Sequence, residues 1–237
     1  MADLAYRRAL LKISGEALAG GQGFGLDFSV IDRLTEEIVE VHDMGASLGV
    51  VVGGGNIVRG AEASRQGFDR VSADYMGMLG TVINALALQE LLEQKNVTTR
   101  VMTAIRMEEL AEPYIRRRAQ RHLEKGRVLL FAGGTGNPFF STDSAAVLRA
   151  LEIEADVLIK ATGVDGVYSA DPKTDPGAEF IPSLTFQDAI VKGLRVMDAN
   201  AFGLCQENKL PIIVMNVNQP GGFARVLRGE RLGTIVR

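Results

Sequence analysis

Apolar residues along the chain fall into short runs, and the segments between these runs repeat apolar residues at helical spacing. Seven runs have the length of a buried strand, at residues 9–13, 47–52, 100–103, 128–132, 157–161, 212–215 and 234–236. Strands that alternate with helices are typical of a parallel sheet covered by helices on both faces. The pattern therefore predicts an α/β fold.

Two of the intervening segments predict well-defined amphipathic helices. The first lies between Asp27 and Gly45, with Asp27 or Ser29 as its cap and Gly45 as its end. Its expected inner face is Val30, Ile31, Leu34, Ile38 and Val41. The second helix is expected at residues 72–94, with an inner face of Leu79, Val82, Ile83, Leu86 and Leu91. Residues 163–182 contain three prolines and three glycines, which predicts an irregular hairpin or a lid.

The composition is that of a soluble globular protein with one core. With 237 residues, 46% hydrophobic and 23% charged, and with no repeat or linker, the chain is expected to form a single domain over residues 1–237. A net charge of −3 argues against nucleic acid or a membrane as the main partner. Cys205 is the single cysteine, which excludes an internal disulfide and suits a reducing compartment. We expect a cytoplasmic protein without a membrane span.

The arginines at positions 116, 117, 118 and 121 form the one basic cluster. Their polar neighbours and helical context favour a solvated helix face. A polyanion site or a subunit contact is the alternative.

Two turns after predicted strands carry residues suited to binding an anion beyond the carboxyl ends of the strands. Lys12 ends the first strand before Ser14 and Gly15, although a surface lysine without a ligand is the alternative. The sequence GGGN at residues 53–56 precedes Arg59. Three successive glycines let the backbone approach a ligand and direct N–H groups toward it.

A third turn, GGTGNPFFSTD at residues 133–143, combines glycines with hydroxyl and amide groups. Its last three residues are expected to cap a helix whose amino terminus attracts anions. Phe139 and Phe140 either border a nucleotide base or fill the core. The loop as a whole predicts a binding site.

A fourth turn begins with Lys160, at the end of a strand that reads as buried. A charged group inside such a strand needs a partner, either a substrate phosphate or Asp143, unless the lysine lies on an edge and reaches solvent. The four turns together place Lys12, Arg59, Lys160 and Asp143 at one edge of the sheet. This arrangement suits phosphoryl transfer, which depends on positioning and charge neutralisation.

Other chemistries lack their residues in this chain. The two histidines, His42 and His122, lie in helical contexts and support neither a zinc site nor a Ser-His-Asp triad. The P-loop signature and the G-x-S-x-G elbow are absent, and the dinucleotide-binding pattern fails at its third glycine.

Five longer segments carry the strongest signal. They are LLKISGEAL at residues 10–18, VVVGGGNIVRG at 50–60, DYMGMLGTVINALAL at 74–88, AGGTGNPFFSTDSAA at 132–146 and ADVLIKATGVDGVYSADP at 155–172. In combination they resemble the bacterial uridylate kinases of the amino acid kinase superfamily. The resemblance implies a three-layer αβα sandwich with about eight mainly parallel strands, a homohexamer built as a trimer of dimers, ATP with Mg²⁺, and UMP as phosphoryl acceptor.

The resemblance also implies roles for individual residues. The residues implied to bind ATP are Lys12, Ile13, Ser14, Gly15, Gly55, Arg59, Thr162, Tyr168 and Asp171. Those implied to bind UMP are Gly54, Asp74, Thr135, Gly136, Asn137, Pro138, Phe139, Phe140, Ser141 and Thr142. The catalytic candidates are Lys12, Lys160, Asp143 and Asp198, although Asp198 equally suits a helix N-cap. Mg²⁺ is expected to be held mainly through the ATP phosphates.

Regulation by GTP and UTP is a further implication of the resemblance. The positions that match a regulatory site are Gly20, Gly21, Gln22, Gly23, Phe24, Gly25, Arg100 and Arg127. Gln89, Glu93 and Glu124 stand where some members have basic residues, so the strength and sign of the response stay open.

Two rival functions remain. One is another amino acid kinase that phosphorylates a carboxylate or carbamate, against which Asp74 and the TGNPFFSTD loop argue. The other is a nucleotide sensor that has lost catalysis, against which the retained Lys12, Lys160 and Asp143 argue.

Overall fold

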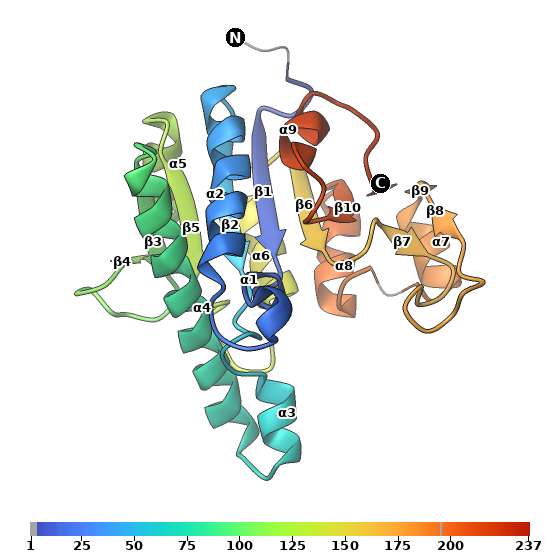
Figure 1. The fold of residues 1–237 in the computed structure, drawn as a ribbon, viewed down its shortest axis with the longest axis horizontal. Coiled ribbons are helices and arrows are strands. Elements are labelled where there is room, and N and C mark those ends of the chain that lie inside the picture. The colour runs from blue at the N-terminus through green and yellow to red at the C-terminus, as the bar shows by residue number, and fades with distance from the viewer. Residues whose placement is uncertain (1–3, 195) are drawn as a thin grey trace.

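The computed structural model describes residues 4–194 and 196–237, which form a nine-stranded sheet between two layers of helices (Figure 1). The order of strands across the sheet is β4-β3-β5-β2-β1-β6-β10-β11-β9. All neighbouring pairs are parallel except β10 and β11, which are antiparallel. The strands are β1 (Arg8–Ile13), β2 (Ser47–Val52), β3 (Thr99–Thr103), β4 (Glu112–Pro113), β5 (Val128–Ala132), β6 (Val157–Thr162), β9 (Ser183–Leu184), β10 (Ile212–Asn216) and β11 (Thr234–Val236).

The expected α/β sandwich is confirmed, and all seven predicted strands are present within one residue of their expected ends. The described part of the chain has nine strands in the main sheet where about eight were expected. The two missed strands, β4 and β9, have two residues each and lie at the two edges of the sheet. Such short segments carry no apolar run that periodicity could reveal.

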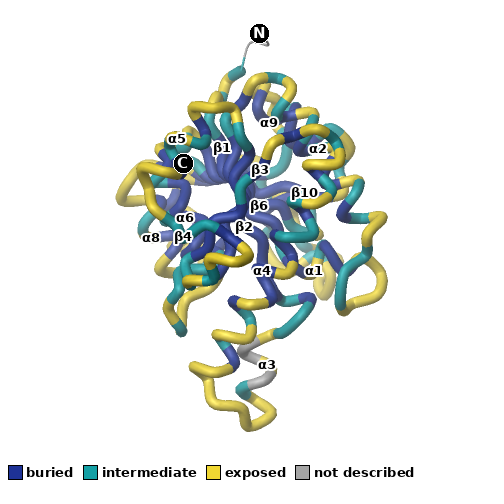
Figure 2. Tube along the Cα trace, turned by 90° about the vertical axis from the view of Figure 1, so that its left-hand side faces the viewer, coloured by how far each residue is buried: buried dark blue, intermediate teal, exposed yellow. Residues whose placement is uncertain are grey.

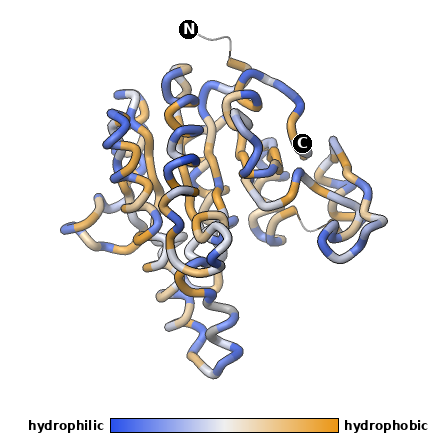
Figure 3. Tube along the Cα trace, viewed as in Figure 1, coloured by the Kyte–Doolittle hydropathy of each residue, from blue (hydrophilic) through white to orange (hydrophobic). Residues whose placement is uncertain are grey.

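Helices cover both faces of the sheet. They are α1 (Gly15–Leu18), α2 (Phe28–Asp43), α3 (Gly60–Arg65), α4 (Arg70–Gln94), α5 (Arg116–Glu124), α6 (Thr142–Glu152), α7 (Phe186–Val191), α8 (Ala199–Glu207) and α9 (Gly222–Leu227). One core packs α2, α4 and α9 against the sheet, and the other packs α5 to α8 against its opposite face. Figure 2 shows buried residues concentrated on the central strands, and Figure 3 shows hydrophobic positions along the strands and hydrophilic ones along the outer loops.

The helix α2 begins and faces inward as the sequence predicts. Asp27 caps it by accepting hydrogen bonds from the backbone N–H groups of Ser29 and Val30. Ile31, Leu34, Ile38 and Val41 are buried in the core, while Val30 is half-buried against it. All four arginines of α5 are exposed in the single chain, as a solvated helix face requires. The alternative of a polyanion site or a subunit contact stays a prediction.

The predicted inner face of α4 was wrong in part. Leu79 and Ile83 are 50% and 45% exposed, whereas Val82 is buried as predicted and Leu86 and Leu91 are half-buried against the core. The other buried apolar residues of the helix are Ala73, Met78, Ala85, Leu88 and Leu92. The helix is apolar on both sides, so periodicity could not tell the two faces apart. By length and composition alone α4 could cross a membrane, but its inner face packs in the protein core.

The segment 163–182 forms the predicted irregular hairpin. Its strands β7 (Val167–Tyr168) and β8 (Phe180–Ile181) pair antiparallel as a small second sheet, with Tyr168 and Phe180 in edge-to-face contact. Figure 1 shows this hairpin beside the carboxyl ends of the central strands, and α3 with the first half of α4 projecting beyond the same edge.

Candidate functional site

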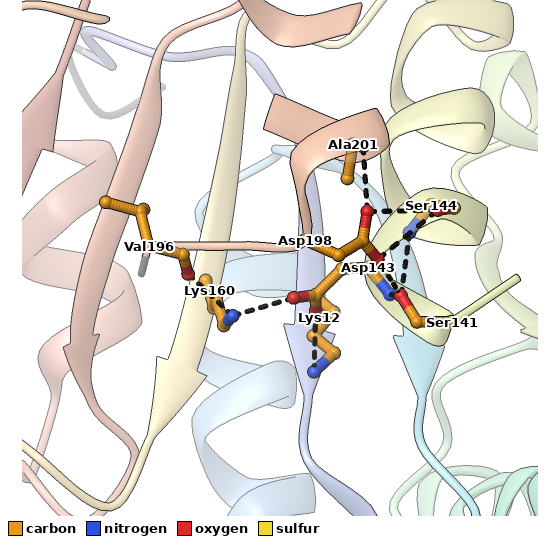
Figure 4. Close-up of polar contacts among 8 residues, drawn as sticks. All are labelled: Lys12, Ser141, Asp143, Ser144, Lys160, Val196, Asp198 and Ala201. Atoms are coloured by element: carbon orange, nitrogen blue, oxygen red, sulfur yellow. Dashed lines mark hydrogen bonds and ion pairs between the residues drawn. The ribbon is translucent and has the colours of Figure 1, made fainter. Parts of the chain in front are cut away.

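Two lysines and one aspartate form a buried cluster of ion pairs near the middle of the sheet (Figure 4). Lys12 on β1 and Lys160 on β6 are register partners, so both side chains leave the same face of the sheet. Asp143, in the first turn of α6, lies between them. Its Oδ1 is 2.9 Å from Lys12 Nζ, and its Oδ2 is 2.8 Å from Lys160 Nζ. One carboxylate therefore holds both ammonium groups.

The charged side chains of this cluster are largely shielded from water, which strengthens the interactions between their charges. Lys12 and Asp143 are 9% and 8% exposed, which excludes a solvated surface lysine at position 12. Burial alone raises the pKa of Asp143, but the charges of Lys12 and Lys160 outweigh this effect and hold the pKa below its usual 3.8. Burial lowers the pKa of Lys160 from its usual 10.5, opposed by attraction to Asp143 and reinforced by repulsion from Lys12. The pKa values of Asp143 and Lys160 are therefore set in part by the charges of the other two residues in the cluster.

Asp198 accepts hydrogen bonds from two helices beside the cluster, α6 and α8. It caps α8 by accepting a hydrogen bond from Ala201 N at 2.9 Å, so the alternative of a helix cap is confirmed. Its carboxylate also accepts hydrogen bonds from the hydroxyl groups of Ser141 and Ser144 on α6. Two residues before it, the carbonyl of Val196 accepts a hydrogen bond of 2.7 Å from Lys160 Nζ. Asp198 thus ties α6 to the segment that orients Lys160.

A cavity of 350 Å³, which we call the α4 cavity, lies at the carboxyl edge of the sheet beside α4. Eight of the predicted binding residues line it: Gly54, Gly55, Arg59, Asp74, Thr135, Phe140, Ser141 and Thr142. Asp74 is the acidic residue of this lining, and both of its oxygens accept hydrogen bonds from Arg70 Nε at 2.8 Å. Arg59 forms an exposed ion pair with Glu16 at 2.9 Å.

A second cavity of 530 Å³, the β7 cavity, lies beside the hairpin. Lys160, Thr162, Tyr168 and Asp171 line it together with Val164, Leu194 and Val196. Lys160 belongs both to this lining and to the ion-pair cluster. The cluster is therefore in contact with the β7 cavity through Lys160, and Asp143 directly follows Thr142 of the α4 cavity.

The outer part of the loop 133–143 lies outside the lining of the α4 cavity. Gly136, Asn137, Pro138 and Phe139 form a turn closed by Thr135 Oγ1, which donates to Asn137 O and accepts from Asn137 N. Their binding of UMP stays a prediction. Phe139 N donates to Asp74 at 2.8 Å. Phe139 and Phe140 are 66% and 50% exposed, so the alternative that they fill the core is wrong.

The three glycines at positions 53–55 are needed for different reasons. A Cβ on Gly53 would lie 2.8 Å from Gly15 N, and one on Gly54 would lie 2.4 Å from Gly77 O on α4. These two glycines therefore allow backbone to pack on backbone. A Cβ on Gly55 would meet nothing described closer than 3.8 Å. Of the three, Gly55 is the one whose open side suits the close approach of a ligand.

The whole arrangement, a parallel sheet with paired lysines on its two central strands and glycine turns at its carboxyl edge, agrees with a known family. Residues 7–216 match the model of the amino acid kinase family. The chain belongs to the amino acid kinase family. Among solved structures, a UMP kinase from Bacillus anthracis is 41% identical with a TM-score of 0.94, over 98% of this chain and 96% of that one.

Two further structures of this kind are similar over nearly the whole chain. A UMP kinase from Ureaplasma parvum is 40% identical with a TM-score of 0.91, over 97% of this chain and 98% of that one. A uridylate kinase from Archaeoglobus fulgidus is 28% identical with a TM-score of 0.74, over 97% and 99%. The resemblance inferred from the sequence motifs is therefore confirmed.

The regulatory positions implied by the amino acid kinase resemblance fall into two separate regions. The segment 20–25 follows α1 at the carboxyl edge of the sheet, where Gly25 and Asn56 bond through both backbone and side chain. Arg100 and Arg127 lie at the amino ends of β3 and β5. Arg100 faces Glu93 and Glu112 at 3.9 and 3.6 Å. The described chain does not bring the two regions together within one protomer.

Sequence reasoning missed several residues that line the cavities. On the α4 side these are Val58, Gly77, Met78, Thr81 and Gly134. Gly77, Met78 and Thr81 lie three, four and seven residues after Asp74, so helical spacing from Asp74 could have found them. Gly193, Leu194 and Val196 of the β7 cavity lie far from its other residues in sequence, and no local pattern marks them.

Proposed function

We propose that the protein transfers the γ-phosphoryl group of ATP to UMP, as a UMP kinase in pyrimidine nucleotide biosynthesis. The observation that carries the proposal is the buried cluster of Lys12, Asp143 and Lys160 beside the α4 cavity and the β7 cavity. The high similarity to UMP kinases over nearly the whole chain supports the choice of acceptor.

In this proposal UMP occupies the α4 cavity and ATP the β7 cavity. The residues proposed to contact UMP are Gly54, Asp74, Thr135, Phe140, Ser141 and Thr142 of this lining, together with residues 136–139 of the same loop. Asp74 would accept hydrogen bonds from ribose hydroxyls. Thr162, Tyr168 and Asp171 contact the adenine nucleotide, and the turn of Lys12, Ile13, Ser14 and Gly15 contacts its phosphates together with Gly55 and Arg59. Because Ile13 is fully buried, it contributes through its backbone.

The reaction requires no general base. A phosphate monoester has its second pKa near about 6, so UMP already carries an ionised oxygen at neutral pH. This oxygen attacks the γ-phosphorus in line, a new P–O bond forms, and the bond to the β,γ-bridging oxygen breaks to release ADP. Lys12 and Lys160 neutralise charge on the transferred group, while Asp143 holds both in place.

Magnesium enters this proposal with ATP. The described residues include no group of three histidine, cysteine or acidic side chains suited to a metal ion, and both oxygens of Asp143 face lysines. The ion would be held mainly through phosphate oxygens, which suits its preference for phosphates and water. It would supply further charge neutralisation.

The decisive experiment measures ADP formation that depends on the acceptor. UMP, CMP, aspartate, acetylglutamate and carbamate are offered in parallel with ATP and Mg²⁺. We expect turnover with UMP well above that with the others. A preference for a carboxylate or carbamate would identify another amino acid kinase, and binding of UMP without turnover would identify a sensor.

Assembly, location and regulation are further proposals that rest on the resemblance of the sequence motifs. We propose a cytoplasmic homohexamer built as a trimer of dimers, which sedimentation can test. GTP and UTP are the proposed effectors. Initial rates over a range of UMP concentrations, with and without each effector, will give the sign of each response.

A further inference from the structure

Two buried polar side chains of α4 bond the two glycine loops beside the α4 cavity. Thr81 is 2% exposed, and its Oγ1 accepts a hydrogen bond of 2.7 Å from Gly133 N, at the start of the loop 133–143. Asn84, with no exposed surface, donates to Gly53 O at 2.6 Å, at the start of the triple-glycine turn. The two residues are three apart and so lie on one face of the helix.

Asn84 also forms a reciprocal amide pair with Asn56. Asn84 Nδ2 donates to Asn56 Oδ1 at 2.7 Å, and Asn56 Nδ2 donates to Asn84 Oδ1 at 2.9 Å. Asn56 Nδ2 donates in addition to Gly25 O at 2.8 Å. The pair is fully buried and each of its side-chain oxygens and nitrogens is bonded, which makes it a rigid junction.

These polar groups stand on a face of α4 that is otherwise apolar. Val82, Ala85 and Leu88 on the same helix are packed in the core. A buried hydroxyl or amide stabilises the fold no better than an apolar group of equal size, since its hydrogen bonds mainly offset the cost of removing it from water. What the bonds add is a defined position for the backbone that they hold.

We propose that Thr81 and Asn84 are positioning residues that set the two nucleotide loops for phosphoryl transfer. The inference rests on the proposed function. Thr81 acts on the loop 133–143, which lines the α4 cavity. Asn84 acts on the turn at Gly53, which packs so closely on Gly15 that a Cβ on Gly15 would lie 2.6 Å from Gly53 O. Asn84 therefore affects both the acceptor side and the phosphate turn of the donor side.

The two roles predict different kinetics. Thr81→Val keeps the shape of the side chain but removes the acceptor for Gly133 N, so the KM for UMP rises about tenfold while the KM for ATP changes less than about twofold. Thr81→Ser keeps the hydroxyl and restores the KM for UMP. Asn84→Leu raises both KM values and lowers kcat about tenfold.

A matched control comes from α2. Thr35 is fully buried and its Oγ1 donates to Asp32 O at 2.6 Å, as Thr81 Oγ1 donates to Met78 O at 2.6 Å, but Thr35 bonds neither loop. Thr35→Val loses the same hydrogen bond to a helix carbonyl and should change neither KM, whereas Thr81→Val in addition leaves Gly133 N without its acceptor and should lower Tm further. If Thr81→Val does not fold, Thr81→Ala and Thr35→Ala, which remove the hydroxyl and the methyl group from both helices, provide a second matched pair.

A second measurement is independent of catalysis. Amide hydrogen exchange in peptides covering residues 133–143 should become about tenfold faster in Thr81→Val and stay unchanged in Thr35→Val. If the wild type makes no ADP with UMP, the proposed function fails, and the exchange result still decides the positioning of the loop. If the wild type is active and Thr81→Val matches Thr35→Val in both KM values and in exchange, the positioning role is refuted.

Discussion

Replacing Asp143 with asparagine removes the one charge that holds the two lysines. At 2.8–2.9 Å and an effective dielectric constant of about 20, each ion pair has a Coulomb energy of about 6 kcal/mol. Desolvation cancels most of this gain, and removing one partner of a buried pair costs about 3–5 kcal/mol. Asparagine keeps one oxygen that can accept a hydrogen bond from one lysine, so we expect the lower end, about 3 kcal/mol. For a chain of this length that loss lowers Tm by about 6–12 °C.

The effect on catalysis should exceed the effect on binding. Without Asp143, Lys12 and Lys160 repel each other and leave the position where charge develops on the transferred group. We expect kcat to fall about 10²–10³-fold. The KM for UMP should stay within about threefold, because Asp143 lies outside the lining of the α4 cavity.

The assay couples ADP formation to a fluorescent or absorbance readout over a range of UMP concentrations, with Tm measured by calorimetry. Asp156→Asn is the control, because Asp156 also accepts two hydrogen bonds, from Arg7 N and Arg8 N, at the amino end of the sheet. The difference in the free energy of unfolding between wild type and Asp143→Asn should be largest at neutral pH, where Asp143 is ionised in both the folded and the unfolded state. It should shrink as pH falls through the lowered pKa of Asp143, below 3.8. A variant with kcat within threefold and Tm within 2 °C of the wild type would refute the reasoning.

The remaining predictions concern five other positions. Lys12→Ala should lower kcat far more than it raises the KM for UMP; near-normal turnover would remove Lys12 from the catalytic residues. Because the pKa of Lys160 lies below its usual 10.5, a pH–rate profile should show kcat falling before pH 10.5 is reached. Lys160→Arg stays charged, so in this variant the alkaline fall in kcat should move to higher pH. Gly54→Ala should lower the free energy of unfolding by about 1–3 kcal/mol because its Cβ meets Gly77 O at 2.4 Å, whereas Gly55→Ala should keep the wild-type Tm and weaken nucleotide binding; equal Tm values for the two variants would contradict this. Burial, with a smaller contribution from Asp143, raises the pKa of Cys205 to about 12, so the thiol should react with a disulfide reagent at pH 8 only after unfolding.

The fold class followed from the sequence because the strands are long, apolar and separated by periodic helices. A buried parallel strand needs apolar residues throughout, and this requirement leaves a mark that can be read without the structure. The caps of α2 and α6 are local in the same sense, since Asp27 and Ser141 bond N–H groups two and three residues away. The glycine turns and both lysines were also visible, because each follows directly on such a strand.

What the sequence left open depends on contacts between distant segments. The inner face of α4 was misjudged in part because apolar residues lie all around this helix, and only its packing against the sheet selects Ala85 and Leu88 over Leu79 and Ile83. The sequence also could not show why each position of the triple-glycine turn needs glycine. Gly53 packs against Gly15 and Gly54 against α4, whereas Gly55 has an open side.

The α/β fold, the four turns that carry the chemistry and the family resemblance could be predicted without coordinates, because they depend on local patterns along the chain. The contacts between distant residues depend on how the chain folds in three dimensions. Asp143 joins lysines that are 131 residues before it and 17 after it, and Asn84 bonds a turn 31 residues before it. Local sequence patterns cannot predict contacts between residues so far apart along the chain, because these contacts arise from the order of strands in the sheet and from the helices that pack on it.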